Sequence, residues 1–279
     1  MTLPAPALVV FAAALGGCIG SFLNVCIHRL PQRRSIVRPR SACPVCAGPI
    51  AWYDNLPVLS WMMLGARCRR CRAPIPWTYP AVEAATALLF LLLFLLRGPT
   101  PAFLEQAWLG ASLIALMVID YRHQILPDLL TLPGIAAGLA FSLLRPGAAN
   151  PIGPGGALRA AIAGAALGYA IPWAINGLYH AWQAVRRVPR AAREDGIGQG
   201  DYKLLAMIGA FLGPAVLLFV LFLGSVSGAA VGLILMRLRG YGWKSRLPLG
   251  VFLGAAGIVA ILVGRPWVDW YLGLAGFGP

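Results

Sequence analysis

The sequence predicts an all-α protein that crosses a membrane several times, and composition and apolar runs support this. Of the 279 residues, 59% are hydrophobic and only 11% are charged, whereas soluble domains carry about 25% charged residues. Apolar runs of about 17 to 25 residues, which can cross a bilayer as helices, occur repeatedly. A membrane barrel would instead show alternating segments of about ten residues, and the sequence has none.

We expect about eight transmembrane helices. The first apolar run, Leu3 to Ile27, carries no charge and is long for a signal peptide, so it is predicted to be a retained span. The apolar block from 204 to 236 is too long for one span and short for two, with candidate breaks at Gly213-Pro214 and Gly224-Ser225. We expect two spans separated at the second break. The predicted spans are 3–27, 81–96, 103–119, 129–144, 157–182, 203–222, 224–236 and 248–264.

The basic residues predict the orientation of these spans. With loops alternating between the two sides, nineteen of the 23 Lys and Arg residues fall on one side. Basic residues favour cytoplasmic loops, so the N-terminus and a tail at 265–279 are predicted outside, and the long loop 28–80 inside. The net charge of +14 is therefore interpreted as a signal of topology, and no nucleic-acid partner is expected.

Four cysteines in the long loop predict a structural zinc site. Cys43, Cys46, Cys68 and Cys71 form two C-x2-C pairs, "CPVC" and "CRRC". Two such pairs present four thiolates in the tetrahedral arrangement that a closed Zn²⁺ site requires. Disulfides are the alternative, which a reducing cytoplasm disfavours. The metal would hold the loop domain together and catalyse nothing.

Three aspartates are predicted to lie at one membrane boundary. Asp120 ends one apolar run, Asp128 opens the next, and Asp201 begins another on the same side. Asp128 is expected to cap the helix that follows it. Asp120 has no such role, because the dipole at the end of a helix disfavours an anion. Asp201 follows three glycines, which allow the backbone to approach another group closely, such as a peptide substrate.

A pair of aspartates suggests peptide hydrolysis. Two neighbouring carboxyl groups in a low-dielectric site share a proton. The ionised one can draw a proton from water while the protonated one polarises the scissile carbonyl. The sequence has no G-x-S-x-G or H-E-x-x-H motif, and its histidines, His28, His123 and His180, are scattered and interpreted as structural. The loop acids Asp54, Glu194, Asp195 and Asp269 are expected to be solvated.

Glu83 is the remaining acid of interest. It lies in "YPAVE", about one helical turn into a predicted span. Ionisable groups at such positions are costly and often functional. The competing interpretation is an interfacial glutamate paired with a loop arginine.

The motifs together resemble the type IV prepilin peptidases. "GIGQGDYKLL" is similar to their G-x-G-D motif, with Gly198, Gly200 and Asp201 in the motif positions and Lys203 following. "IDYRHQILPDLLTLP" resembles their other aspartate segment, which places the first catalytic acid at Asp120 and includes Asp128. "GSFLNVCIHRLP", the paired cysteines and "YPAVE" are similar to the family's first span, cytoplasmic loop and second span.

The resemblance implies an enzyme of the bacterial inner membrane. Such enzymes cleave the basic leader of type IV prepilins and pseudopilins after glycine at the cytoplasmic face. Many members also methylate the new N-terminus with S-adenosylmethionine. We expect loop 28–80, the largest aqueous segment beside the acids, to serve methylation, with Glu83 as the candidate base, and residues 81–264 to form the peptidase core. Other pilus or type II secretion components are possible partners.

Three alternatives remain open from the sequence. The first is a prepilin peptidase without methyltransferase activity. The second is a proton-coupled transporter or channel, since intramembrane acids and broken helices also occur there. Against it, the sequence shows no repeated halves and its acids lie at one face. The third is a zinc-bearing scaffold of a secretion machine, which leaves Asp120 and Asp201 unexplained.

Overall fold

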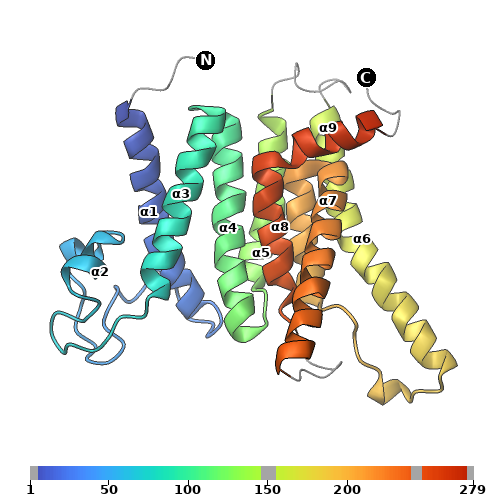
Figure 1. Ribbon diagram of the computed structural model, residues 1–279, viewed down its shortest axis with the longest axis horizontal. Helices are drawn as coiled ribbons and strands as arrows, with labels where there is room; N and C mark the ends of the chain where they lie inside the picture. Colours follow the sequence, from blue (N-terminus) through green and yellow to red (C-terminus); the bar gives the residue numbers. More distant parts are fainter. Residues whose placement is uncertain (1–5, 146–154, 240–246, 275–279) are drawn as a thin grey trace. The chain divides into compact units, whose positions relative to one another are not determined.

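The computed structural model describes residues 6–145, 155–239 and 247–274, and within these ranges the chain is helical, with only isolated β-bridges (Figure 1). The all-α prediction is confirmed. The chain divides into two compact units, with the boundary between Val118 and Ile119.

The first unit is built on two antiparallel helices, α1 (Pro6–Arg29) and α3 (Thr78–Arg97). Glycines on α1 allow the two backbones to approach closely, since a side chain at Gly16 would lie 2.7 Å from Phe90 and one at Gly20 would lie 2.7 Å from Glu83. Small residues commonly hold membrane helices together in this way. The loop between α1 and α3 contains a 3₁₀ turn, η1 (Trp52–Asn55), and a short helix, α2 (Leu59–Met63). Most of α4 (Pro101–His123) completes the unit.

The second unit begins in the last turn of α4 and is centred on α7, which packs against α5, α6 and α8. Gly164 of α6 lies directly against Gly209 of α7, so neither position has room for a side chain. The elements are α5 (Asp128–Leu143), α6 (Gly156–Val185), η3 (Arg190–Ala192), α7 (Gln199–Arg239), α8 (Leu249–Val259), the π-helical turn η4 (Ala260–Gly264) and α9 (Arg265–Leu274).

A break inside α7 lies at Gly213, where φ is 78° and ψ is 175°. Glycine adopts this conformation without the strain that a Cβ would cause. Pro214 follows and has no N–H to continue the helical ladder. The predicted break at Gly224-Ser225 is therefore wrong. Gly224 instead packs against Leu253 of α8, at a position where a side chain would lie 2.8 Å away.

The two arms of α7 run in opposite directions, as the ribbon in Figure 1 also shows. The first residues of α7 and of α8 both pack against Leu126, so these two helices start at the same end. Beyond α8, Gly264 packs against Val216, and further along α7 Gly232 packs against Leu247, just before α8 begins. The second arm therefore returns to the end at which the first arm started.

Five helices within the described ranges, α1, α3, α4, α6 and α7, are long and apolar enough to cross a membrane. The chain is therefore a multi-pass membrane protein, although the predicted count of eight spans is not confirmed. The shorter apolar helices are Asp128–Leu143 and Leu249–Gly264. Residues 265–274 of the predicted external tail form α9, which contacts α7 through Trp267 and Phe219, with ring centroids 5.1 Å apart. Residues 1–5, 146–154, 240–246 and 275–279 lie outside the described residues.

Candidate active site

Asp120 lies in the last turn of α4 and is only 6% exposed. Its carboxylate Oδ2 accepts a hydrogen bond from the backbone N–H of Val251, at 3.2 Å. Gly250 lies equally close, since a side chain there would lie 2.8 Å from the same oxygen. The carboxylate therefore meets the N-terminus of α8, where free N–H groups and the helix dipole favour an anion.

Asp201 is in the first turn of α7 and is partly buried. Its backbone N–H donates to the carbonyl of Gly198, at 3.0 Å. Gly200, the residue before Asp201, packs against Leu126, and Leu126 also lies against Gly250 at the start of α8, beside the Asp120 carboxylate. The second unit therefore places the two predicted aspartates at the same end of its helices, although 80 residues lie between them in the sequence.

The glycines of the motif are accounted for by contacts within the chain. A side chain at Gly200 would lie 2.9 Å from Leu126, and one at Gly198 would lie 3.3 Å from the Asp201 carboxylate. Small residues at these positions let the start of α7 pack closely on the segment that follows Asp120. The backbone at Gly200 therefore lies close to another group as expected, and that group is Leu126 of the same chain.

Asp128 and Lys203 form an ion pair, with Nζ and Oδ1 2.6 Å apart. Asp128 is the first residue of α5, and the position before the helix is occupied by Pro127. The carboxylate thus connects α5 to the first turn of α7 instead of capping its own helix as predicted. Because both side chains are partly exposed, the pair contributes about 1 kcal/mol at most.

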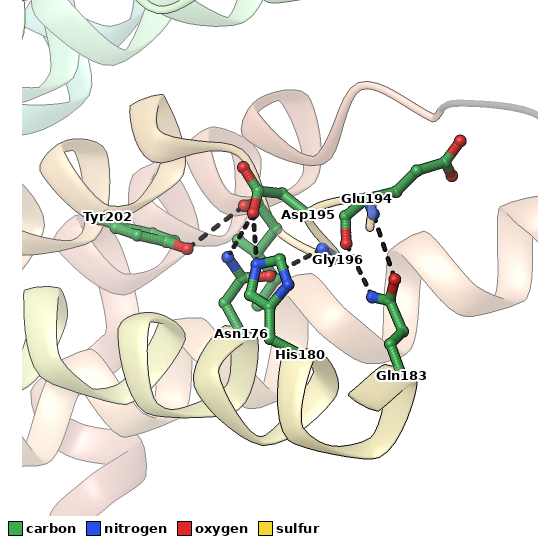
Figure 2. Close-up of polar contacts among 8 residues, drawn as sticks. Asn176, His180, Gln183, Glu194, Asp195, Gly196 and Tyr202 are labelled. Carbon is green, nitrogen blue, oxygen red and sulfur yellow. Dashed lines mark hydrogen bonds and ion pairs between the residues drawn. The ribbon is translucent and has the colours of Figure 1, made fainter. Parts of the chain in front are cut away.

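A cluster of polar side chains on α6 holds the segment that leads into the motif (Figure 2). Asp195 Oδ1 accepts a hydrogen bond from Asn176 Nδ2 at 3.0 Å and lies 2.7 Å from His180 Nε2. The Asn176 side-chain oxygen accepts the backbone N–H of Gly196, at 2.7 Å. The hydrogen bond from Asn176 and the contact with His180 lower the pKa of Asp195 below its ordinary value.

One turn further along α6, Gln183 binds the backbone of Glu194 twice. Its Nε2 donates to the carbonyl at 2.9 Å, and its Oε1 accepts the N–H at 3.2 Å. Gln183 is buried and Asn176 is nearly so, which shields these bonds from competing water. We call the contacts of Asn176, His180 and Gln183 with residues 194–196 the α6 latch.

The four loop cysteines converge as predicted. Their Sγ atoms all lie within 4.8 Å of one another, and those of Cys43 and Cys71 are 3.8 Å apart. All four are free thiols, which does not support the disulfide alternative. A metal bound tetrahedrally at about 2.3 Å to sulfur requires sulfur atoms about 3.8 Å apart. The cluster therefore fits a metal ion held by four thiolates.

The two halves of the cluster repeat the same turn, a relationship that the sequence analysis missed. "CPVCAGPI" and "CRRCRAPI" both follow the pattern C-x-x-C-x-x-P-I. Each half closes with an antiparallel bridge, Ala42 to Pro49 and Arg67 to Pro74. The backbone N–H groups of Cys71 and Arg70 lower the pKa of Cys68 to about 6. Such N–H groups favour the thiolate that a metal requires.

Comparison with known proteins agrees with this arrangement. Residues 14–96 match the bacterial peptidase A24 N-terminal domain, and residues 107–233 match the type IV leader peptidase family. A relative from Burkholderia pseudomallei (strain 1026b), named prepilin leader peptidase/N-methyltransferase, is 37% identical over 98% of this chain and 90% of its own length. The chain belongs to the type IV leader peptidase family.

Two further relatives of this family carry the same name. One from Pseudomonas aeruginosa is 35% identical over 97% of this chain and 96% of its own length. One from Myxococcus xanthus is 42% identical over 84% of this chain, and the match spans 65% of that relative. No solved structure matches the chain.

Glu83 of this leader peptidase borders a cavity of about 620 Å³ inside the first unit. Its Oε2 accepts the backbone N–H of Val58, at 2.7 Å, and the residue is 9% exposed. A backbone amide is therefore one hydrogen-bond partner of Glu83, where the competing interpretation expected an arginine. The lining also includes Ser21 and Asn24 of α1 and, from the loop, Asp54, Trp61, Arg69 and Arg70.

The sequence analysis missed the α6 latch because it treated Glu194 and Asp195 as solvated loop acids and His180 as an isolated structural residue. A signal was present. Asn176, His180 and Gln183 are spaced i, i+4 and i+7, which places three polar side chains on one face of an apolar helix. Such a face can bind the carboxylate of Asp195, the backbone N–H and carbonyl of Glu194, and the backbone N–H of Gly196.

Proposed function

We propose that this chain is a membrane-embedded aspartic endopeptidase that removes the basic leader from type IV prepilins or pseudopilins after a glycine. Asp120 and Asp201 are the catalytic residues. The observation that carries the proposal is that the Asp120 carboxylate lies at the N-terminus of α8 while Asp201 lies in the first turn of α7, and that both helix starts pack against Leu126. The names of relatives that share most of the chain support the substrate class.

In this proposal the acid pair works by general acid–base catalysis. Two interacting carboxyl groups share one proton, so one is a base and the other an acid at the same pH. The base removes a proton from water, and the acid donates a hydrogen bond to the scissile carbonyl as the water attacks. The donor Val251 N–H keeps Asp120 in a fixed orientation during this exchange. The proton returns to the leaving amine when the carbon–nitrogen bond breaks.

We also propose that the chain methylates the new N-terminal amine, with S-adenosylmethionine as the donor. The cavity of about 620 Å³ in the first unit has the size of a small-molecule site. It combines arginines, which can bind the donor's carboxylate, with the aromatic side chains of Tyr53 and Trp61, against which an adenine can stack. Glu83 borders the cavity and is the candidate base for the ammonium that cleavage produces.

The cysteine cluster is proposed to hold a structural Zn²⁺. Four thiolates leave no open coordination position, so the metal stabilises the loop that encloses the cavity and takes no part in chemistry. Cys43, Cys46, Cys68 and Cys71 are the ligands.

The site is proposed to face the cytoplasm at the bacterial inner membrane, with the N-terminus outside. Nineteen of the 23 basic residues fall on the side of the predicted spans that carries loop 28–80, and basic residues favour the cytoplasmic side. The basic leader of a prepilin and the soluble methyl donor are both available on that side.

One assay tests both activities. The purified protein is incubated with a prepilin peptide, with and without S-adenosylmethionine, and the products are weighed. We expect loss of the leader in both samples, and an added mass of one methylene on the mature product only when the donor is present. Cleavage without methylation would favour the peptidase-only alternative, and an intact peptide would refute the peptidase proposal.

A further inference from the structure

The segment Trp52–Met63, in the loop between α1 and α3, packs against the middle of both helices. Pro57 lies against Gly17 of α1, where an added side chain would meet the proline ring at 3.1 Å and Ala87 of α3 at 4.0 Å. Ser21 of α1 hydrogen-bonds Asn55 across 3.4 Å. The loop therefore folds back along the helix pair. Figure 1 shows α2 in this part of the loop, alongside α1 and α3.

The depth of this packing follows from helix geometry. Gly17 lies twelve residues before the last residue of α1, Arg29, and Ala87 lies nine residues after the first residue of α3, Thr78. At a rise of 1.5 Å per residue, the level of Pro57 is about 18 Å along α1 from Arg29 and about 13 Å along α3 from Thr78. Both helices are long and apolar enough to cross a membrane. The hydrocarbon core of a bilayer is about 30 Å thick, so this depth lies within it.

The outer side of the segment is apolar and open. Trp52 is 81% exposed and Met63 is 84% exposed, while Leu59 and Met62 are more than half exposed. Two polar members lie on the inner side: the Ser60 hydroxyl donates to the carbonyl of Tyr53 at 3.0 Å, and the Asp54 carboxylate, whose side chain is 11% exposed, pairs with Arg69. Asn55 is exposed and bonds Ser21 of α1. The outer surface of the segment is therefore mostly, though not wholly, apolar.

The backbone of the segment is paired in a way that suits hydrocarbon. The N–H of Leu56 donates to the Ser60 hydroxyl at 2.9 Å, and the N–H of Val58 donates to Glu83 at 2.7 Å. The N–H groups of Leu59, Ser60, Met62 and Leu64 all find carbonyl acceptors within the segment. Irregular backbone is tolerated at membrane depth only when its polar groups are satisfied by the protein.

We propose that residues 52–63 form a re-entrant segment whose apolar side contacts the acyl chains and headgroup boundary of the bilayer leaflet on the loop's side. Lipid is the occupant because the segment lies at the depth of two candidate spans. Its exposed side also continues their lipid-facing surfaces, which include Leu88 of α3. Trp77 stands exposed at the start of α3, as aromatic residues do at membrane interfaces.

The segment also bears on the methyl-transfer site, a consequence that rests on the proposed function. Tyr53, Leu56 and Trp61 line the cavity that Glu83 borders. A lipid-embedded wall places this cavity beside the membrane, where the new N-terminus of an apolar pilin helix lies. The segment would therefore let one cavity serve a soluble donor and a membrane-bound acceptor.

The test is photo-crosslinking to lipid, which does not depend on either activity. The photoreactive residue p-benzoyl-phenylalanine replaces Met63 in the full-length protein, reconstituted in vesicles of phosphatidylethanolamine and phosphatidylglycerol. Leu88 is the positive control on α3, and Val45, which is 71% exposed on a cysteine turn, is the matched control in the same loop. Lipid adducts are quantified by mass spectrometry after irradiation.

We expect Met63 to form lipid adducts at the level of Leu88, at least tenfold above Val45. Adducts at Met63 no higher than at Val45 would overturn the proposal, and so would efficient crosslinking to a second protein chain in place of lipid. In a second arm, Glu83→Leu removes the acceptor of the Val58 N–H and should lower the Met63 adduct severalfold. Glu83→Gln keeps an oxygen acceptor and should preserve it. Equal adducts in both variants would refute the anchoring role of Glu83, whatever the catalytic assays show.

Discussion

The carboxylate of Asp120 and the backbone N–H of Val251 are joined by a hydrogen bond of 3.2 Å, although the two residues are 131 positions apart in the sequence. This contact resolves a difficulty raised by the sequence. Asp120 lies at the end of its own helix, where the dipole disfavours an anion. The N-terminus of α8 supplies the opposite field and a donor. The position of the carboxylate therefore depends on α8 as much as on α4.

The first prediction concerns the acid pair. Asp120→Asn and Asp201→Asn should each reduce prepilin cleavage by about 10²- to 10⁴-fold, the range that general acid–base groups contribute. Asparagine is nearly isosteric but can neither accept a proton from water nor share one. Cleavage is measured on the purified variants by mass spectrometry.

Asp128→Asn is the matched control, because it removes a carboxylate at the same end of the unit whose ion-pair partner is Lys203. This variant should keep cleavage within a few-fold of wild type. Near wild-type cleavage by either Asp120→Asn or Asp201→Asn would exclude that residue from catalysis.

The second prediction concerns the metal. Elemental analysis of the purified protein should find about one zinc per chain. The double variant Cys43→Ser/Cys68→Ser should lose it, since it removes one ligand from each C-x-x-C turn. Cys18→Ser/Cys26→Ser is the control, because these two cysteines lie on α1 outside the cluster. A metal content unchanged in the first variant would refute the site.

The sequence predicted the helical class and the cysteine cluster because apolar length and ligand spacing are local properties. It also predicted that Asp120 and Asp201 lie at one boundary, since both occur at the ends of apolar runs. It could not place the break in α7. Gly213-Pro214 and Gly224-Ser225 are both local break signals, and the packing of Gly224 against Leu253 shows why the helix continues through the second. The Asp120–Val251 bond joins distant segments through a single hydrogen bond, which leaves no periodic trace in the sequence.

The third prediction concerns Glu83. Glu83→Gln should reduce methylation of the mature pilin at least tenfold while leaving cleavage near wild type, because glutamine retains an acceptor for the Val58 N–H but is not a base. The measurement scores the added methylene separately from leader removal. Wild-type methylation in this variant would show that Glu83 is structural only.

The fourth prediction concerns pH. The pKa of Asp195 is lowered by the hydrogen bond from Asn176 and the contact with His180. An acid with a depressed folded-state pKa stabilises the fold above its unfolded pKa of about 3.9, and this contribution is lost as the pH falls through the lower folded value. Protection of the Gly196 amide in hydrogen exchange, corrected for the intrinsic rate, should therefore decline below about pH 4.

The control for this pH dependence is Asp195→Asn, which keeps a side-chain oxygen for Asn176 but has no charge to lose. Its Gly196 amide should show a flat profile over the same range. An identical decline in both proteins would assign the effect to other carboxyl groups.

The last prediction concerns the α6 latch, which fixes residues 194–196, separated by Ile197 from the G-x-G-D motif that begins at Gly198. Asn176→Ala removes the bonds to Asp195 and to the Gly196 N–H, each worth about 1 kcal/mol. If the loss of these bonds raises the activation free energy of cleavage by about 1–2 kcal/mol, kcat for cleavage falls roughly 5- to 30-fold. KM should change little, because nothing in the latch is proposed to bind the leader. Methylation of a pilin that is already cleaved should also be unaffected, because that site is assigned to the first unit.

Gly177→Ala is the matched control for the latch, since it changes the neighbouring residue on α6, where an added side chain meets nothing within 4 Å. This variant should keep the wild-type kcat. If Asn176→Ala lowered cleavage and methylation equally, the residue would be a general folding element. If it raised KM at constant kcat, the latch would act on leader binding. Only a fall in kcat confined to cleavage agrees with α6 positioning Asp201 through the segment that precedes it.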